Sequence, residues 1–452
     1  MSATEFLRQN REKSLEELND WLRIPSVSAK SEHKADTARA AEWLAERMRQ
    51  AGLTTVEVVP TAGHPVVLGE WRGAPGRPTL LVYGHYDVQP PEPLDEWKSP
   101  PFEPTVRDGK LFARGSVDDK GQAYLHLKAV EAHLANGGSL PVNVVFLIEG
   151  EEEVGSPHLA EFLAANADRL ACDAVLISDT TMFAPGLPSI TIGLRGLAYM
   201  EVRVQGPAVD LHSGAYGGAV VNPANALAKI IAQLHDDRGR VTIPGFYDRV
   251  RDLTQAERDA IAKLPFQEEG LREEVGAPKL GGEAGYGSLE RIWARPTLDV
   301  NGLLSGYTGE GAKTVLPARS MAKVSMRLVP DQDFREIERL FIDHVKSLAP
   351  EGVTVEVEAL HGGMPWYAEP SGAVFEAARR ALSQAFEREP VVIREGGSIP
   401  IVQAFQETLG APVVLIGFGL PGENAHAPNE WMSVDNYHRG AEAIAALYDE
   451  LR

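Results

Sequence analysis

The chain has 452 residues, of which 44% are hydrophobic and 24% are charged. This length and composition indicate a soluble protein with a sizeable core, and they exclude a disordered chain, a collagen and a small disulfide-bonded scaffold. The 64 acidic and 44 basic residues give a net charge of −20, which repels the phosphate backbone of nucleic acids. We therefore expect no nucleic-acid partner.

The cysteine content and the apolar runs bear on the compartment. The single cysteine, Cys172, can form no internal disulfide, so nothing requires an oxidising environment. The first 20 residues are polar and lack the apolar core of a signal peptide. The longest apolar runs, at 80–83 and 144–148, are far shorter than the roughly 18 residues of a membrane span. We expect a cytoplasmic protein with no membrane partner.

The first part of the chain predicts helices that alternate with buried strands. Helices are expected over 4–23, from Asp36 or Thr37 as the capping residue to Gly52, over 120–136 and over 157–168, and strands over 56–59, 65–69, 79–83, 142–148 and 174–178. Because these strands are apolar throughout, the pattern predicts a largely parallel sheet that is covered on both faces.

The pattern changes after a Gly- and Pro-rich stretch near residue 185. Mixed or alternating strands are expected over 197–204, 323–329 and 353–360, with a helix over 221–234. A second break at 361–372 precedes helix 371–386, strand 390–393, helix 400–408, strand 413–418 and helix 434–451. The simplest organisation is an α/β domain in two parts, 1–194 and 363–452, with an α+β domain inserted at 195–362.

Side chains that could bind a metal ion follow the predicted strands of the first domain. Strand 79–83 leads to His85 and Asp87, a pair in which imidazole can bind a metal and the acid can orient the ring. The alternative for this short pattern is a turn with a structural histidine. Asp118 and Asp119 lie before helix 120–136, where they serve either as an N-cap pair or as a carboxylate that bridges two cations.

An acidic run follows strand 142–148. Acids occupy positions 149, 151, 152 and 153. Such a run is usually a solvated face, but here it directly follows an apolar strand, and cations would relieve the mutual repulsion of its carboxylates.

Two further residues complete the set. Asp179 follows strand 174–178 and His426 follows strand 413–418; each taken alone is an ordinary loop residue. The carboxyl ends of parallel strands are where ligands bind in an open α/β sheet. Together the set supplies two nitrogens and three carboxylates, which suit two zinc or manganese ions. Its members are His85, Asp118, Glu153, Asp179 and His426. Glu152 is left as a general base for a metal-bound water.

Seven segments, in this order along the chain, resemble the M20 metallopeptidases, with the greatest similarity to the carnosinase-like cytosolic dipeptidases. These segments are LLVYGHYDVQP, ARGSVDDKG, EGEEEVGS, LISD, DLHSGAYGG, REGGSIP and NAHAPNE. The resemblance implies a zinc-peptidase-like catalytic domain and an inserted lid and dimerisation domain. It also implies two divalent ions, with His85 and Asp179 on one, Glu153 and His426 on the other, and Asp118 on both.

The resemblance implies roles for residues outside the ligand set. Asp87 orients His85, Glu152 activates the metal-bridging water, and the Asp118–Asp119 peptide bond is cis. His212 stabilises the oxyanion in the active site of a second subunit, which implies a homodimer. Arg327 is placed to clamp a substrate carboxylate, although it is equally suited to a strand surface. Further members of the implied substrate pocket are Thr314, His361, Glu395, Gly397 and Ser398.

The predicted function is hydrolysis of the peptide bond in dipeptides or short peptides with a free C-terminal carboxylate. Zn²⁺ is the expected metal, with Mn²⁺ and Co²⁺ as alternatives. A second hypothesis is an N-acyl amino acid deacylase similar to acetylornithine deacetylase or succinyl-diaminopimelate desuccinylase, because both reactions hydrolyse an amide. A third is a non-catalytic protein that binds metal or peptide, which the intact base Glu152 disfavours.

Overall fold

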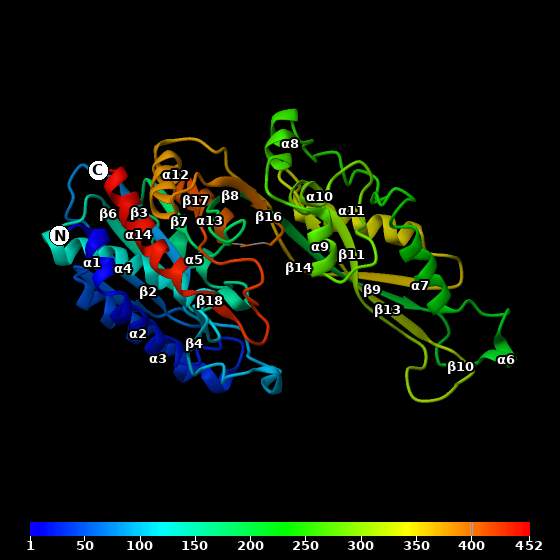
Figure 1. The fold of residues 1–452 in the computed structure, drawn as a ribbon. Coiled ribbons are helices and arrows are strands. Elements are labelled where there is room, and N and C mark those ends of the chain that lie inside the picture. The colour runs from blue at the N-terminus through cyan, green and yellow to red at the C-terminus, as the bar shows by residue number, and fades with distance from the viewer. Residues whose placement is uncertain (398, 400) are drawn as a thin grey trace. The chain divides into compact units, whose positions relative to one another are not determined.

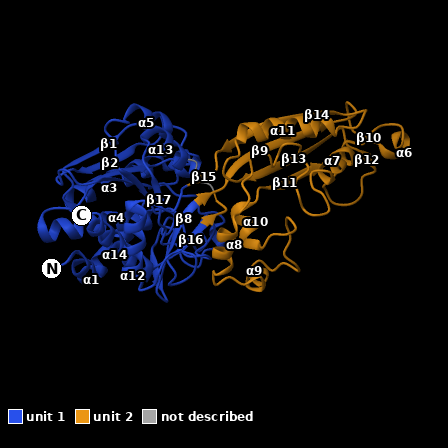
Figure 2. Cartoon of the chain, turned by 90° about the horizontal axis from the view of Figure 1, so that it is seen from above, with its two compact units in different colours: residues 1–192, 368–393, 401–452 blue, residues 193–367, 394–400 orange. Residues whose placement is uncertain are grey.

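The fold is that of a computed structural model, which describes residues 1–397, 399 and 401–452 (Figure 1). Contacts divide the chain into two compact units, coloured separately in Figure 2. Unit 1 contains Met1–Ile192, Ala368–Ile393 and Ile401–Arg452, and unit 2 contains Gly193–Tyr367 and Arg394–Pro400. The divisions at 192/193 and 367/368 lie a few residues from the expected boundaries at 194/195 and 362/363, and strand β8 (Ser189–Leu194) continues through the first. The short segment Arg394–Pro400, expected in the second part of the α/β domain, belongs to unit 2.

Unit 1 contains eight α-helices among its described residues. These are α1 (Ala3–Gln9), α2 (Arg11–Leu22), α3 (Lys34–Ala51), α4 (Lys120–Gly137), α5 (Leu159–Ala165), α12 (Ala373–Phe386), α13 (Ile401–Leu409) and α14 (Val434–Glu450). The helix predicted over 4–23 is two helices, because Asn10 ends α1 and its side-chain amide donates to the carbonyl of Phe6 at 2.8 Å. The predicted cap at Asp36 or Thr37 was wrong. His33 is the N-cap of α3, and both residues lie in its first turn, where they bond to His33.

The main sheet of unit 1 has four parallel strands at its centre. Its order is β1 (Thr55–Val59), β2 (Val66–Trp71), β6 (Asn143–Glu149), β3 (Thr79–His85), β7 (Ala174–Ile177), β17 (Val413–Leu415) and β8 (Ser189–Leu194), with β16 (Val391–Glu395) beside β8. Strands β6, β3, β7 and β17 run parallel, whereas β1, β2 and β8 are antiparallel to their neighbours. The predicted mostly parallel central sheet is confirmed.

Helices cover both faces of this sheet. Figure 2 shows α5 and α13 on one side and α4, α12 and α14 on the other. Phe405 of α13 packs edge-on against Tyr83 of β3, with ring centroids 5.0 Å apart. Most of α4 is buried between β3 and the helices α2, α3 and α14, which explains why its sequence has little amphipathic character. Burial on both faces accounts for the continuous apolar runs of β3 and β6.

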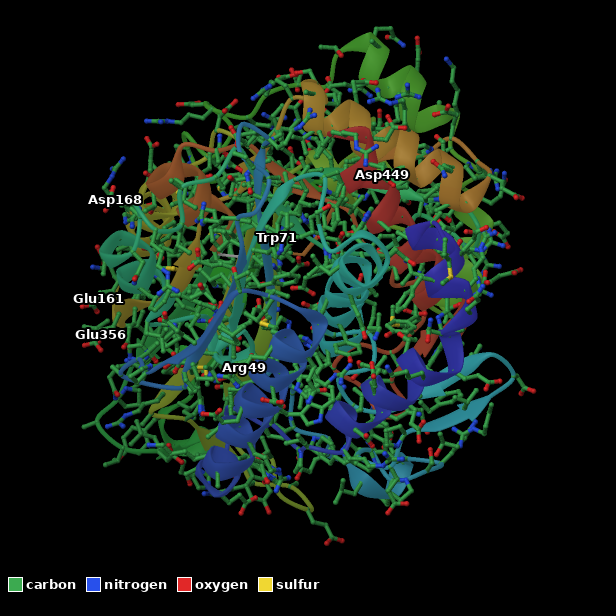
Figure 3. The ribbon with its side chains drawn as sticks, turned by 90° about the vertical axis from the view of Figure 1, so that its left-hand side faces the viewer. Arg49, Trp71, Glu161, Asp168, Glu356 and Asp449 are labelled. Atoms are coloured by element: carbon green, nitrogen blue, oxygen red, sulfur yellow. The ribbon has the colours of Figure 1, made fainter. Side chains whose placement is uncertain are left out.

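The two ends of the chain meet in unit 1. Helix α1 packs on α14, and Figure 1 shows both termini at the same end of this unit. Arg8 and Arg11 bind the two oxygens of the Glu442 carboxylate at 2.8 and 2.9 Å, and the Glu442 side chain is only 4% exposed. Unit 1 buries some charged side chains, such as those of Asp87 and Glu430, and exposes others. Glu161 and Asp168 lie at its margin in Figure 3, whereas Trp71 lies within it.

A small antiparallel sheet lies next to the loops that carry Asp118 and His426. It pairs β4 (Thr105–Arg107), β5 (Lys110–Phe112) and β18 (Trp431–Ser433). Three short 3₁₀ helices complete the unit: η1 (Ser31–His33), η2 (Leu94–Glu96) and η3 (Glu152–Val154). Because β5 precedes Asp118 and β18 follows His426, this sheet joins two segments that are distant in sequence.

Unit 2 is built on an antiparallel sheet in the order β11 (Thr297–Ser305), β13 (Arg319–Leu328), β9 (Gly196–Gln205) and β14 (Thr354–Gly363). Buried residues alternate along β9 and β13, as predicted for a half-exposed antiparallel strand, and α7 (Pro223–Ala232) and α11 (Phe334–Ser347) cover the apolar face. Its other elements are β10 (Leu211–His212), α6 (Ser213–Tyr216), α8 (Gln255–Ala262), α9 (Glu268–Glu274), α10 (Ser288–Ala294), β12 (Val315–Leu316) and β15 (Trp366–Tyr367). Strand β11 was not predicted. No helix among the described residues of the chain is long and apolar enough to span a membrane.

Candidate metal centre

The carboxyl ends of three neighbouring parallel strands bring the predicted ligands together. His85 is the last residue of β3, Glu153 lies in η3 just after β6, and Asp179 lies two residues beyond β7. Strand β3 pairs in parallel with both β6 and β7, so these ends lie at one edge of the sheet. This is the edge at which open α/β sheets bind ligands.

His85, Asp118 and Asp179 form the first ligand-capable group. The His85 side chain is fully buried, and its Nε2 lies 3.1 Å from Asp118 Oδ1 and 3.8 Å from Asp179 Oδ2. The His85 Nδ1 lies 3.0 Å from the carbonyl oxygen of Asp87. The ring is thus held from behind while Nε2 faces the two carboxylates, the arrangement expected of a metal-binding histidine.

Asp118, Glu153 and His426 form the second group. His426 Nε2 lies 2.9 Å from Asp118 Oδ2 and 3.3 Å from Glu153 Oε2. The side-chain amide of Gln89 donates to Glu153 Oε2 at 2.8 Å. His426 reaches the group from a loop position with a φ of 63°. Asp118 therefore presents one oxygen to each group, and the three ligand atoms of each group lie within 4.8 Å of one another.

Asp118 and Asp119 occupy the loop that enters α4. The peptide bond between them is cis, as the resemblance predicts. Asp119 is the N-cap residue of α4, but its side chain makes no capping hydrogen bond; instead Asp119 Oδ2 accepts from the backbone N–H of His85 at 3.2 Å. The interpretation of these two residues as a simple capping pair is therefore wrong.

Asp87 organises the acidic turn as well as His85. Its carboxylate, fully buried, accepts from the backbone N–H groups of Glu152 and Glu153 at 3.2 and 3.1 Å. Its Oδ1 lies 3.4 Å from His85 Nδ1, farther than its own carbonyl oxygen. Asp87 thus holds η3 in place through its side chain and His85 mainly through its main chain.

The electrostatics of the centre favour cations. Burial raises the pKa of Glu153 to about 8 and also raises the pKa values of Glu152 and Asp179, and the charge on Asp118 adds to all three increases. Burial opposes ionisation of Asp118 too, but hydrogen bonds from His426 and His85 outweigh it and lower its pKa. The bond to Asp118 in turn raises the pKa of His426 to about 9.

The donor set fits two divalent metal ions. It offers two imidazole nitrogens and carboxylate oxygens from three acids, in two overlapping groups that share Asp118. Nitrogen and carboxylate ligands of this kind suit zinc, manganese and cobalt, and clustered carboxylates at low exposure are stabilised by divalent charge. The residues present therefore fit a dinuclear centre, without distinguishing between these metals.

The remaining predicted site residues lie in unit 2. His212 and Thr314 are brought together, because β10 pairs with β12 and the N–H of Ser213 donates to the carbonyl of Thr314 at 3.0 Å. The His212 Nδ1 accepts from the N–H of Gly214 at 3.0 Å, so in this chain it caps a turn. Arg327 lies on β13 and His361 lies on β14. The His361 ring is tilted by 43° against the ring of Tyr199, with centroids 5.0 Å apart.

Two predicted residues, Glu395 and Gly397, lie at the end of strand β16 or just after it. Glu395 ends this strand, and the carbonyl of Gly397 accepts from the N–H of Arg195 at 3.1 Å. Ser398 lies outside the described residues.

Sequence reasoning missed Gln89, which positions Glu153, and Glu430, which closes the NAHAPNE segment. A polar residue in a segment already singled out is the signal by which Glu430 could have been found.

Comparisons with known proteins agree with this fold and identify the family. Residues 81–450 match the model of "Peptidase family M20/M25/M40". The chain is 34% identical to the Cys-Gly metallodipeptidase DUG1 of Candida albicans, with 97% of this chain and 94% of that protein covered. It is 31% identical to the human Beta-Ala-His dipeptidase, with 99% and 92% covered.

A solved structure shares nearly the whole architecture. The M20 family metallo-carboxypeptidase Sso-CP2 from Sulfolobus solfataricus superposes with a TM-score of 0.86 at 36% identity, over 97% of this chain and 99% of that one. A two-unit α/β fold with two adjoining groups of ligand residues at the sheet edge is typical of dinuclear metallohydrolases. The chain belongs to peptidase family M20/M25/M40.

Proposed function

We propose that this chain hydrolyses the peptide bond of dipeptides, or of short peptides, that carry a free C-terminal carboxylate. Membership of the M20 family makes it a metal-dependent peptidase, and its relatives include Cys-Gly and Beta-Ala-His dipeptidases. The observation that carries the proposal is the pair of ligand groups that share Asp118, with Glu152 beside them.

We propose that the ligands are distributed over two ions as the geometry pairs them. His85 and Asp179 would hold one ion, Glu153 and His426 the other, and Asp118 both. When bound, the ions supply a Lewis acid for the scissile carbonyl and lower the pKa of the attacking water. Zn²⁺ is the proposed metal, and Mn²⁺ or Co²⁺ would suit the same ligands.

Glu152 is the proposed general base. Its backbone is fixed by Asp87, and its carboxyl group interacts electrostatically with His85, Asp118 and His426. In the proposed reaction its carboxylate takes a proton from the attacking water as the oxygen bonds to the carbonyl carbon. The same carboxyl then delivers this proton to the amine nitrogen as the C–N bond breaks.

Unit 2 contributes the proposed substrate contacts. His212 would donate to the tetrahedral oxyanion, and Arg327 would bind the terminal carboxylate through its planar guanidinium. Other proposed contacts are Thr314, His361, Glu395 and Gly397. We further propose a homodimer formed through unit 2, the lid and dimerisation domain, in which His212 serves the active site of the other subunit. Unit 1 is the proposed catalytic domain and the proposed compartment is the cytoplasm.

The test is turnover of a mixed dipeptide library by metal-free protein, before and after addition of Zn²⁺ or Mn²⁺. Tripeptides, N-acetyl amino acids and N-succinyl amino acids are assayed in parallel. Metal-dependent release of free amino acids from dipeptides is the expected result, and the tripeptides define the length limit. Cleavage confined to the N-acyl compounds would instead identify a deacylase that uses the same centre.

A further inference from the structure

A buried carboxylate outside the ligand set holds the loop that carries Asp118. Glu430 is fully buried, and its Oε2 accepts from the backbone N–H of Gly115 at 2.9 Å. Its Oε1 accepts from the N–H groups of Val117 and Asp118 at 3.0 and 3.2 Å. One carboxylate thus binds three backbone donors within four consecutive residues that include the shared ligand.

These bonds replace the ones that regular secondary structure would supply. Residues 113–119 lie between β5 and α4 in neither a helix nor a strand, and their buried N–H groups need acceptors. The carbonyl of Glu430 also accepts from the N–H of Ala113 at 3.2 Å. The conformation of this loop, and with it the direction in which Asp118 points, therefore depends on a residue 312 positions later in the sequence.

Glu430 also lies close to the second histidine. It is four residues after His426, on the loop that leads into β18. Asn429, its neighbour, is fixed as well, because its side chain accepts from the N–H of Lys98 and donates to the carbonyl of Glu96, both at 2.8 Å. The loops that bear Asp118 and His426 are thus joined to each other through Glu430.

The charge of Glu430 is balanced within this cluster. Arg114 donates from Nη1 to Glu430 Oε2 at 2.8 Å, and the Arg114 side chain is only 1% exposed. The pair is neutral overall. Glu430 therefore adds little to the repulsion among the four acids of the centre, which are the ligands Asp118, Glu153 and Asp179 and the proposed base Glu152. A charged acceptor nonetheless makes stronger bonds to backbone N–H groups than a neutral one.

We propose that Glu430 is a positioning residue that sets the spacing between Asp118 and His426. It thereby sets the affinity for the metal ion that the second ligand group, Asp118, Glu153 and His426, would hold. The proposal rests on the dinuclear centre proposed above. Glu430 touches neither substrate nor metal in this scheme; it acts through the main chain of the loop that presents Asp118. Partners that orient metal ligands typically change metal affinity by 10- to 100-fold.

The test compares Glu430→Gln with a matched control, Glu442→Gln. The amide that Glu430→Gln introduces would place an NH₂ group against one of the N–H donors. Glu442 is a similarly buried carboxylate, paired with Arg8 and Arg11 away from either ligand loop. Metal-free wild type and both full-length variants are titrated with Co²⁺. The readouts are the stoichiometry and the visible absorption bands of the bound Co²⁺, and thermal unfolding is measured for the metal-free proteins.

We expect wild type and Glu442→Gln to bind two Co²⁺ with the same spectrum, although the control loses thermal stability. For Glu430→Gln we expect about tenfold or greater weakening of one Co²⁺ and altered absorption bands. Two Co²⁺ bound with wild-type affinity and spectrum would overturn the proposal and leave Glu430 a merely structural residue. Failure of wild type itself to bind Co²⁺ would overturn the dinuclear centre, so the two failures are distinguishable.

A second variant applies if Glu430→Gln does not fold. Glu430→Asp keeps the charge but withdraws the carboxylate by one methylene, so it cannot reach all three N–H donors. About tenfold weakening of one Co²⁺ is expected, at the lower end of what lost orientation of a ligand causes. Wild-type affinity in this variant would equally overturn the proposal.

Discussion

The backbone N–H of Glu152 donates a hydrogen bond to the carboxylate of Asp87 at 3.2 Å. Asp87 also accepts from His85 Nδ1 through its carbonyl oxygen at 3.0 Å. One residue therefore fixes the proposed base and a proposed metal ligand relative to each other. Because Asp87 is fully buried, this relationship is insulated from solvent.

Replacing Glu152 by Gln should remove turnover but leave the metal. The amide cannot accept the proton of the attacking water, and a positioned base typically contributes 10²- to 10⁴-fold to the rate. We expect kcat to fall by about that factor, with two metal ions per chain by elemental analysis. Glu151→Gln is the control, since Glu151 bonds to His158 rather than to the centre, and it should retain most activity. Wild-type turnover in Glu152→Gln would refute the assigned base.

Divalent metal should stabilise the folded protein. Burial, together with the charge on Asp118, raises the pKa values of Glu152, Glu153 and Asp179, and bound cations favour the charged forms of these carboxylates. At a free Zn²⁺ or Mn²⁺ concentration of about 100 times Kd, the free energy of unfolding should rise by about 2.7 kcal/mol for each of the two ions bound. Urea unfolding with and without metal measures this. Asp118→Asn should lose most of the gain and Asp168→Asn, at the surface, none; equal gains in both would contradict the shared role of Asp118.

Arg327 should matter only for substrates that have a C-terminal carboxylate. A charge-assisted bond to a guanidinium contributes roughly 1.5–3 kcal/mol, so Arg327→Ala should lower kcat/KM for a dipeptide by about 10- to 100-fold. The corresponding dipeptide amide should be cleaved equally by variant and wild type. Lys323→Ala, on the same strand β13, controls for a general loss of positive charge. An equal loss for acid and amide would show that Arg327 does not recognise the carboxylate.

The proposed exchange of His212 between subunits makes a quantitative prediction. Glu152→Gln and His212→Ala should each be inactive alone. If His212 acts in the other subunit, a mixed dimer has one complete site, so random mixing of equal amounts should recover about one quarter of wild-type activity in a two-fold symmetric dimer. The mixture is unfolded and refolded together before assay. No recovery in dimers shown to have exchanged would place His212 in its own subunit's site.

His126 should make stability depend on pH. Burial lowers its pKa to about 3, and its Nε2 lies 2.7 Å from the hydroxyl of Ser178. Between about pH 6.5 and pH 3 the unfolded chain binds one more proton at this residue than the folded one, so its contribution is complete above pH 6.5 and declines as the pH falls. The difference in unfolding free energy between wild type and His126→Gln should therefore shrink by about 1.4 kcal/mol from pH 7.5 to pH 5.5. A difference independent of pH would contradict this.

Periodicity predicts most of the elements of unit 1 because its strands and helices bury their apolar residues in regular patterns. The runs that became β3 and β6 were recognisable since both faces of these strands are covered. The N-cap of α3 could not be predicted from residue type. Asp36 and Thr37 are the usual capping residues, but the backbone already becomes helical after His33. Strand β11 was missed because several of its residues, such as Leu303 and Leu304, are exposed and give no alternating pattern.

The ligand groups were predictable to the extent that they follow strand ends. His85, Glu153 and Asp179 lie at or just after the ends of β3, β6 and β7, so the parallel register alone brings them together. Asp118 and His426 lie in loops, and each taken alone has an ordinary structural alternative. They entered the ligand set because they follow predicted strands together with the other three residues, and the resemblance to a family was needed only to distribute the set over two ions. The role of Glu430 was not predictable, because it depends on hydrogen bonds between loops that are distant in the sequence.

The neighbouring strands β7 and β17 have a consequence for how the protein is made. Strand β7 ends at Ile177 and β17 begins at Val413, so one side of β7 lacks a partner until residues 413–415 have left the ribosome. The residues of unit 2 lie between β7 and β17 in the sequence, so they are synthesised during that interval and unit 2 can fold then. During this time the incomplete sheet has an unpaired apolar edge strand. Exposed edges of this kind promote aggregation of nascent chains. Synthesis of residues 413–450, which add β17 and α14, is therefore the step that closes the sheet and packs α14 against α1.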